Sequence, residues 1–277
     1  MIRNKFQTNS NADWSNQVRI AAFLMPFLAL LAGGAGFVFR RLELVYVFDA
    51  VTGLPTRGAV VTYTLIAICA AFALIALLFS IFVACKRNAP RGFENSFGTD
   101  GLSYPFSFGI IGLIWLGATI VNFLNMRQTG TVLLTDIYFT VLSAIAAISV
   151  SFFAVEMFQD GRRKSVYALS VIPTLFMCFW LVMLYRDNAT NPILLSFAYK
   201  CLAIITSALG FYFTSGFVYG KPAPGKTLFF YFTAILFCFV TIADNHTMMV
   251  RIIFAAILAM NVLYSSKLIR HLRIKQK

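Results

Sequence analysis

The feature that most constrains this chain of 277 residues is a series of eight apolar segments, each about as long as a membrane-spanning helix. A bilayer core about 30 Å thick is crossed by roughly 20 helical residues. The segments are continuous rather than alternating, which predicts helices and not the strands of a membrane barrel. They run over Val18–Phe39, Ala59–Cys85, Tyr104–Asn125, Thr131–Phe158, Ser165–Tyr185, Pro192–Tyr219, Thr227–Ala243 and Thr247–Ser266.

The composition agrees with a membrane protein, because 60% of the residues are hydrophobic and only 12% are charged. A soluble globular domain has about twice that share of charge. We therefore predict an all-α, polytopic transmembrane helix bundle with about eight spans. The spanning domain (18–266) is expected between a cytoplasmic N-terminal segment (1–17) and a basic cytoplasmic tail (267–277).

The Lys and Arg residues orient the predicted spans, because short cytoplasmic loops retain positive charge. Sixteen of the 23 lie on the side that holds both termini, and five lie on the opposite side. Both termini are thus predicted to be cytoplasmic. The net charge of +13 follows from this bias rather than from a nucleic-acid site, and we expect no nucleic-acid partner. The basic tail is expected to contact anionic lipid headgroups.

Asp136 and Lys200 are among the few ionisable residues inside predicted spans, where a charge costs about 2.5 to 3.5 kcal/mol on insertion scales. The predicted boundaries place them about 8 and 12 Å below the outer face. Each begins a stripe of small or polar residues at helical spacing. The candidate intramembrane polar site comprises Asp136, Lys200, Thr140, Ser143, Ser207 and Asn122.

Two interpretations of this site are open. Asp136 and Lys200 could line an outward-facing polar cavity that continues down the stripes, as a solute or ion route requires. Alternatively, they form a structural ion pair that holds a tight helix interface. We favour the ion pair, because buried pairs often have only a structural role.

Two further groups of polar residues lie at the predicted outer face. Asp244, His246 and Arg251 form a candidate outer-interface cluster near the short turn before the last span. Glu43 and Asp49, in the predicted outer loop from Arg40 to Gly58, could bind a cation or a partner. We favour the simpler interpretation that these two carboxylates neutralise the nearby arginines, since surface ion pairs are common and weak.

The segment Glu43–Gly58, ELVYVFDAVTGLPTRG, contains an ELxxxFDxxTGL pattern. In this it resembles uncharacterised multi-spanning membrane proteins of clostridial bacteria that have a similar loop after the first span. The resemblance covers this loop and, more loosely, the layout of the spans. It implies a location in the bacterial cytoplasmic membrane and no particular activity.

Catalytic signatures such as HExxH and GxSxG are absent from the sequence, and the five cysteines have no metal-ligand spacing. We therefore expect a non-enzymatic protein without a cofactor, acting as a membrane-embedded sensor, scaffold or assembly subunit. The last of these roles implies a protein partner in the membrane. The alternative is a transporter or permease component for a small solute or ion that uses the polar route near Asp136 and Lys200.

Overall fold

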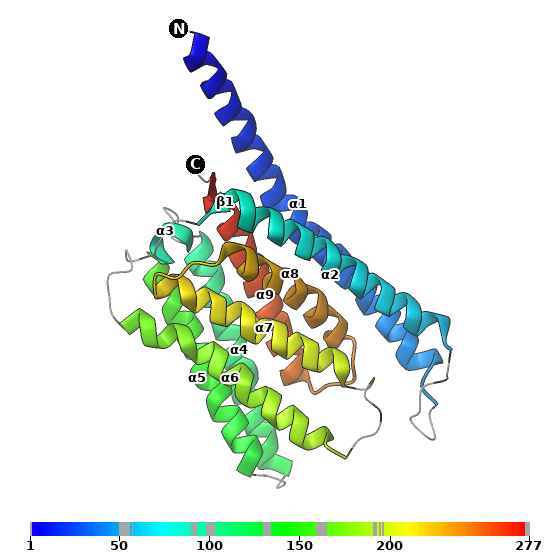
Figure 1. Cartoon of the computed structure of the whole chain (residues 1–277). Coiled ribbons are helices and arrows are strands. Elements are labelled where there is room, and N and C mark those ends of the chain that lie inside the picture. Colours follow the sequence, from blue (N-terminus) through cyan, green and yellow to red (C-terminus); the bar gives the residue numbers. More distant parts are fainter. Residues whose placement is uncertain are drawn as a thin grey trace.

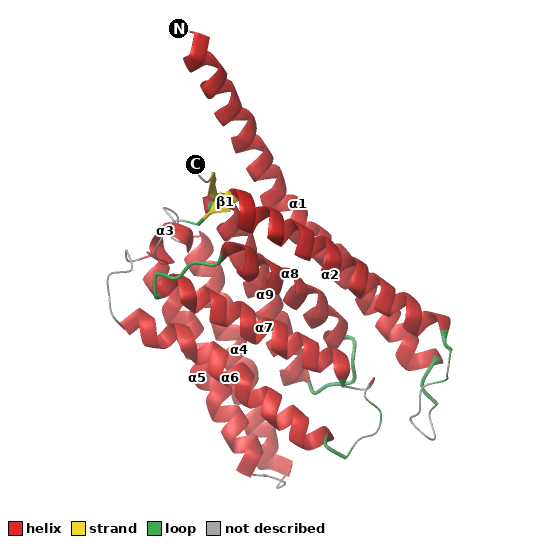
Figure 2. Ribbon diagram, in the orientation of Figure 1, coloured by secondary structure: helices red, strands yellow, loops and turns green. Residues whose placement is uncertain are grey.

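The computed structural model describes residues 2–49, 56, 58–89, 93–97, 103–129, 134–158, 165–190, 193, 195 and 197–274. Over these residues the chain is helical almost throughout (Figures 1 and 2). The helices are α1 (Ile2–Tyr46), α2 (Val60–Lys86), α3 (Phe93–Phe97), α4 (Ser103–Thr129), α5 (Leu134–Phe158), α6 (Ser165–Asn188), α7 (Ala198–Val218), α8 (Pro224–Ile242) and α9 (Met248–His271). The short strands are β1 (Arg87–Asn88) and β2 (Arg273–Ile274).

The predicted all-α transmembrane bundle is confirmed. In the part of the chain that the structure describes, seven helices are long and apolar enough to cross a membrane, namely α2 and α4 to α9. The first predicted span, Val18–Phe39, lies within α1. This protein is therefore a multi-pass integral membrane protein.

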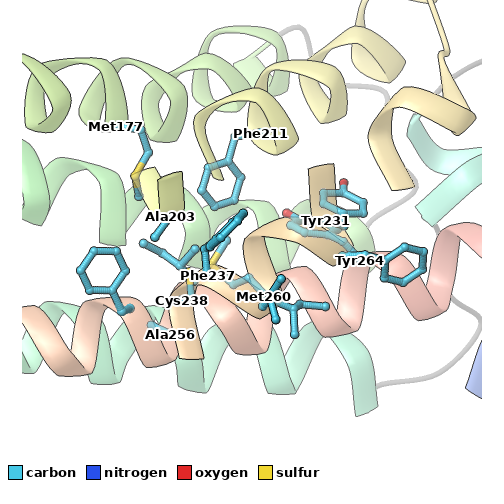
Figure 3. Close-up of a cluster of buried hydrophobic side chains, with 14 of the residues drawn as sticks. Met177, Ala203, Phe211, Tyr231, Phe237, Cys238, Ala256, Met260 and Tyr264 are labelled. Atoms are coloured by element: carbon cyan, nitrogen blue, oxygen red, sulfur yellow. The ribbon is translucent and has the colours of Figure 1, made fainter. Parts of the chain in front are cut away.

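Helix α8 lies at the centre of the bundle, where it contacts α1, α2, α7 and α9. In the most apolar 18-residue segment of α8, 72% of the residues are buried, whereas in that of α2 only 28% are. Helix α2 therefore leaves large hydrophobic side chains exposed to lipid. The core around α8 includes Phe211 of α7, Tyr231 and Cys238 of α8, and Met260 of α9 (Figure 3). Helices α4, α5 and α6 lie beside this centre, and each packs on the next. They join it through two contacts, of α6 with α7 and of α4 with α9.

Both ends of the described chain lie at the same end of the bundle (Figure 1). Strand β1, directly after α2, pairs antiparallel with β2, directly after α9. The loop and the tail that the sequence places on the cytoplasmic side are therefore neighbours. This arrangement agrees with an even number of crossings.

Two predicted span boundaries and one predicted loop require correction. Helix α1 continues through Arg40 to Tyr46, so the outer loop is shorter than predicted; residues 50–55 and 57 of that loop lie outside the described residues. Helix α7 begins at Ala198 rather than Pro192. The predicted inner loop contains the short helix α3, whose Phe97 is fully buried against Tyr264 of α9.

Candidate functional site

A cleft of about 310 Å³ lies among the ends of five helices at the predicted outer face. Its volume is at the lower end of the range for small-molecule sites. Polar and apolar side chains share its wall. The lining residues are Asn122 and Met126 of α4; Asp136, Phe139 and Thr140 of α5; Trp180, Met183, Leu184 and Asp187 of α6; Lys200 of α7; and Thr247, Met249 and Val250 at the start of α9.

The cleft contains both charged residues of the candidate intramembrane site, Asp136 and Lys200. Among the described residues, however, no ion pair joins them within 4.0 Å. The structural pair that we favoured from the sequence is therefore not formed. The Lys200 ammonium instead lies 6.0 Å from the centre of the Trp180 ring. A third carboxylate in the wall, Asp187, is paired with Arg186 at 2.8 Å.

Lys200 is shallower than the sequence suggested. It lies two residues, or about 3 Å, from the start of α7. Asp136 has the same position in α5, which begins at Leu134. Both charges thus sit in the first turn of a helix, where water can reach them from the outer face.

Aromatic side chains close the cleft toward the membrane centre. Phe139 and Trp180 lie in its wall, and their ring centres are 5.3 Å apart. One turn deeper, Phe176 contacts Phe139 at 5.5 Å and the buried Trp115 at 5.6 Å between ring centres. The cleft is therefore open at the outer end and closed below by packed rings.

The stripe on α5 continues below these rings into a dry contact with α4. Ser143 is fully buried and accepts a hydrogen bond of 2.9 Å from the indole Nε1 of Trp115. Its hydroxyl also lies 3.1 Å from that of Thr119. Ser143 thus lies outside the cleft.

The stripe on α7 faces a different helix, α8. Ser207 is fully buried, donates a hydrogen bond of 2.6 Å to the Ala203 carbonyl, and lies 3.7 Å from the Cys238 thiol. About two turns further on, Thr214 hydrogen-bonds Tyr231 of α8, which lies in the core shown in Figure 3. The two predicted stripes therefore form separate helix interfaces, one with α4 and one with α8.

Beside the cleft lies a buried group of charges that the sequence did not predict as a unit. Arg40 of α1 is 1% exposed, and it donates from Nε to Asp244 and from Nη1 to Glu43, each at 2.6 Å. Its Nη2 donates to the Leu195 carbonyl at 3.3 Å. We call Arg40, Glu43 and Asp244 the outer ion cluster. It ties α1 to the turn between α8 and α9.

The remaining residues of the predicted outer-interface cluster contact this ion cluster. Arg251 donates from Nη2 to the backbone carbonyl of Asp244 at 3.2 Å. The Nε2 atom of His246 lies 3.7 Å from the Asp244 carboxylate. The structure therefore brings Asp244, His246 and Arg251 together. Of the two outer-loop carboxylates, Glu43 is buried on Arg40, whereas Asp49 is exposed.

Two contacts complete the surroundings of the cluster. Thr62 of α2 donates to the second oxygen of Glu43 at 2.7 Å. The guanidinium of Arg40 lies 4.9 Å from the centre of the Tyr199 ring, within range of a cation–π interaction. Both carboxylates pair with the one guanidinium, which gives the cluster a structural character, whereas Oδ2 of Asp244 is buried without a hydrogen-bond partner in the described part of the chain.

His246 is neutral at physiological pH. Burial lowers its pKa to about 4, and the nearby charges of Lys200, Arg251 and Arg40 add to this effect. Its imidazole is therefore uncharged in this turn, and its buried Nε2 atom has no hydrogen-bond partner among the described residues.

The cleft and the outer ion cluster are joined by neighbouring residues of the chain. On α7, Tyr199 contacts Arg40, and the next residue, Lys200, lines the cleft. In the turn before α9, His246 lies beside the cluster, and the next residue, Thr247, lines the cleft. A movement of either backbone segment would therefore affect both.

Among the described residues, no group of three His, Cys, Asp or Glu side chains is placed to hold a metal ion. In comparisons with known proteins, no protein family, curated protein or solved structure matches this chain.

Proposed function

We propose that this multi-pass protein is a sensor in the bacterial cytoplasmic membrane that binds a small charged solute in the outer cleft. The observation that carries the proposal is the placement of Asp136 and Lys200 in one open cleft without an ion pair between them. A charge that is partly removed from water without an ion-pair partner is costly. A solute that supplies the partners would remove that cost.

Sensing accounts for the geometry better than transport does. The rings of Phe139, Phe176 and Trp115 close the cleft below, and the stripes on α5 and α7 face different helices. A transport pathway would need both stripes to line one wet cavity. A sensor needs only a site on one face and a connection to the other.

Helix α1 is suited to be that connection. Its outer end is fixed by Arg40 to the turn that carries Thr247 of the cleft. Its 45 residues span about 68 Å, roughly twice the thickness of a bilayer core. The opposite end projects past the other helices at the face where both termini lie (Figure 1). We infer that this projecting part carries the signal to a partner inside the cell.

The charge distribution supports the proposed location. The excess of Lys and Arg on the side of the termini fits a cytoplasmic face, and the resemblance of the Glu43–Gly58 segment points to bacteria. The basic tail would contact anionic headgroups on that face.

Thiol accessibility tests the binding site. In a background without the native cysteines, Asn122→Cys should react with a membrane-impermeant thiol reagent added outside, and amino acids, amines, carboxylates or sugars should be screened for protection. Ser207→Cys, buried against α8, is the matched control and should stay unreactive. The binding proposal would be refuted if Asn122→Cys did not react with the reagent, or if none of the solutes protected it.

Two measurements then separate sensing from transport. With a protecting solute, backbone hydrogen exchange at the outer end of α1 should change, because that end is joined to the cleft through the ion cluster. In proteoliposomes the same solute should not cross faster than in protein-free liposomes. Protein-dependent flux of that solute would favour transport and refute sensing as the main role.

A further inference from the structure

We propose that the solute of the outer cleft is a zwitterion whose ammonium and carboxylate are joined by a short apolar chain. This inference rests on the proposed binding function and specifies its ligand class. It starts from the two charges in the wall of the cleft, Asp136 on α5 and Lys200 on α7. They are opposite in sign and form no ion pair with each other in the described part of the chain.

The balance of charge in the cleft favours a zwitterion over a singly charged solute. An amine would neutralise Asp136 and leave Lys200 without an anion, whereas a carboxylate would do the reverse. Asp187 and Asp244 also act electrostatically on Lys200, but each carboxylate already pairs with an arginine, Asp187 with Arg186 and Asp244 with Arg40. Only a solute with both charges satisfies the two residues at once, and a polar site rejects a ligand that leaves one of its groups unpaired.

The spacing and the walls favour an apolar chain between the two charges. The carboxylate of Asp136 and the ammonium of Lys200 are more than 4.0 Å apart. A ligand that pairs with both must therefore carry its two charges at separate positions and extend between the two side chains. The walls of that interval include Phe139, Trp180 and Met249. Methylene groups bury well against such side chains. The arrangement therefore fits an amino acid with its amine at the end of the chain better than a sugar or a polyol.

Ligand competition with matched solutes tests this inference on the full chain in nanodiscs. The probes are unbranched ω-amino acids of two to six carbons, with the n-alkylamine and the n-alkanoate of each length, measured by calorimetry. We expect at least one ω-amino acid to bind tenfold or more tightly than both of its singly charged analogues. The series also reports the distance that the cleft spans.

Two variants should separate the roles of the charges. Lys200→Gln should lose the preference of the cleft for the ω-amino acid over the alkylamine, while it still binds the alkylamine. Asp136→Asn should lose the preference over the alkanoate and still bind the alkanoate. Retained binding of the analogue shows that each variant is folded. Lys226→Gln, which removes an exposed charge at the start of α8 outside the cleft, is the control and should keep both preferences.

The outcomes distinguish the zwitterion inference from the proposal that the cleft binds a solute at all. An alkylamine or an alkanoate that binds the unaltered protein as tightly as the ω-amino acid would overturn the zwitterion and leave the binding function in place. Binding of no probe in the series would also overturn it. In that case the thiol protection of Asn122→Cys decides separately whether the cleft binds any solute.

Discussion

Replacing Arg40 with methionine should strongly destabilise the bundle, because it leaves two buried carboxylates without their shared cation. Arg40 is 1% exposed, Glu43 is fully buried, and the side chain of Asp244 is 6% exposed. Neither carboxylate can turn to water without opening the contact between α1 and the turn after α8. The substitution therefore tests whether the outer ion cluster holds these elements together.

The expected loss follows from the number of contacts that Arg40 makes. Removing one partner of a buried ion pair costs about 3–5 kcal/mol. Arg40 serves two carboxylates at 2.6 Å each, and its stacking on Tyr199 contributes about 1 kcal/mol more. We expect Arg40→Met to lower the free energy of unfolding by about 5 kcal/mol.

A combined variant separates the cost of unpaired charge from the value of the cluster itself. Replacing a whole buried ionic group by hydrophobic residues of similar volume is often close to neutral. Arg40→Met together with Glu43→Met and Asp244→Leu should therefore recover most of the loss. Arg186→Met is the matched control, because its pair with Asp187 is about half exposed and worth about 0–1 kcal/mol.

The measurement is reversible unfolding in mixed micelles, with helix content as the signal. A single variant Arg40→Met within about 1 kcal/mol of the unaltered protein would refute a buried, paired arginine. A combined variant that loses at least as much as the single one would refute the role of uncompensated charge.

Three further predictions concern other parts of the chain. The free energy of unfolding should fall by up to about 3 kcal/mol as the pH falls from about 6.5 to about 4, because in this range His246 binds a proton in the unfolded chain but not in the folded protein. His246→Gln should remove this component from the pH dependence of unfolding. In a cysteine-free background, Thr56→Cys should label from outside whole cells and Asn88→Cys should not, and the reverse pattern would invert the predicted orientation. Gly112→Ala should lower stability by about 1–3 kcal/mol, because its methyl group would meet the backbone and a side chain of α5, whereas Gly117→Ala, which has open space around it, should not lower stability.

The architecture could be predicted from the sequence because lipid permits few alternatives. An apolar segment of about 20 residues must satisfy its backbone internally, so it forms a helix. The ends of the helices were less predictable. Arg40 was expected to end α1, yet the helix continues because its charge is paired inside the protein rather than exposed to water.

The candidate site was only partly accessible from the sequence. Asp136 and Lys200 stand out because a charge within an apolar segment is rare. Their neighbours along each helix were expected to face the same cavity, but periodicity gives the face of a helix and not the identity of its partner. Ser143 faces α4 and Ser207 faces α8.

The outer ion cluster could not have been derived from the sequence as a unit. The spacing of Arg40 and Glu43 is that of an ordinary pair on one helix turn. The third member, Asp244, is 204 residues away, and each of the three residues alone looks like a headgroup contact at a helix end. Only the packing of α1 against α8 removes them from water and makes their pairing obligatory.

The position of the cluster also explains why the cleft can keep two charges apart. If Lys200 were free to move, it would be drawn to the nearest carboxylate. Its backbone is held in place because the preceding residue, Tyr199, is 5% exposed and stacked on Arg40, which is itself fixed by Asp244. The buried cluster therefore fixes the backbone from which Lys200 extends into the cleft, and under the proposed function a solute bound by Lys200 would act on Arg40 through Tyr199.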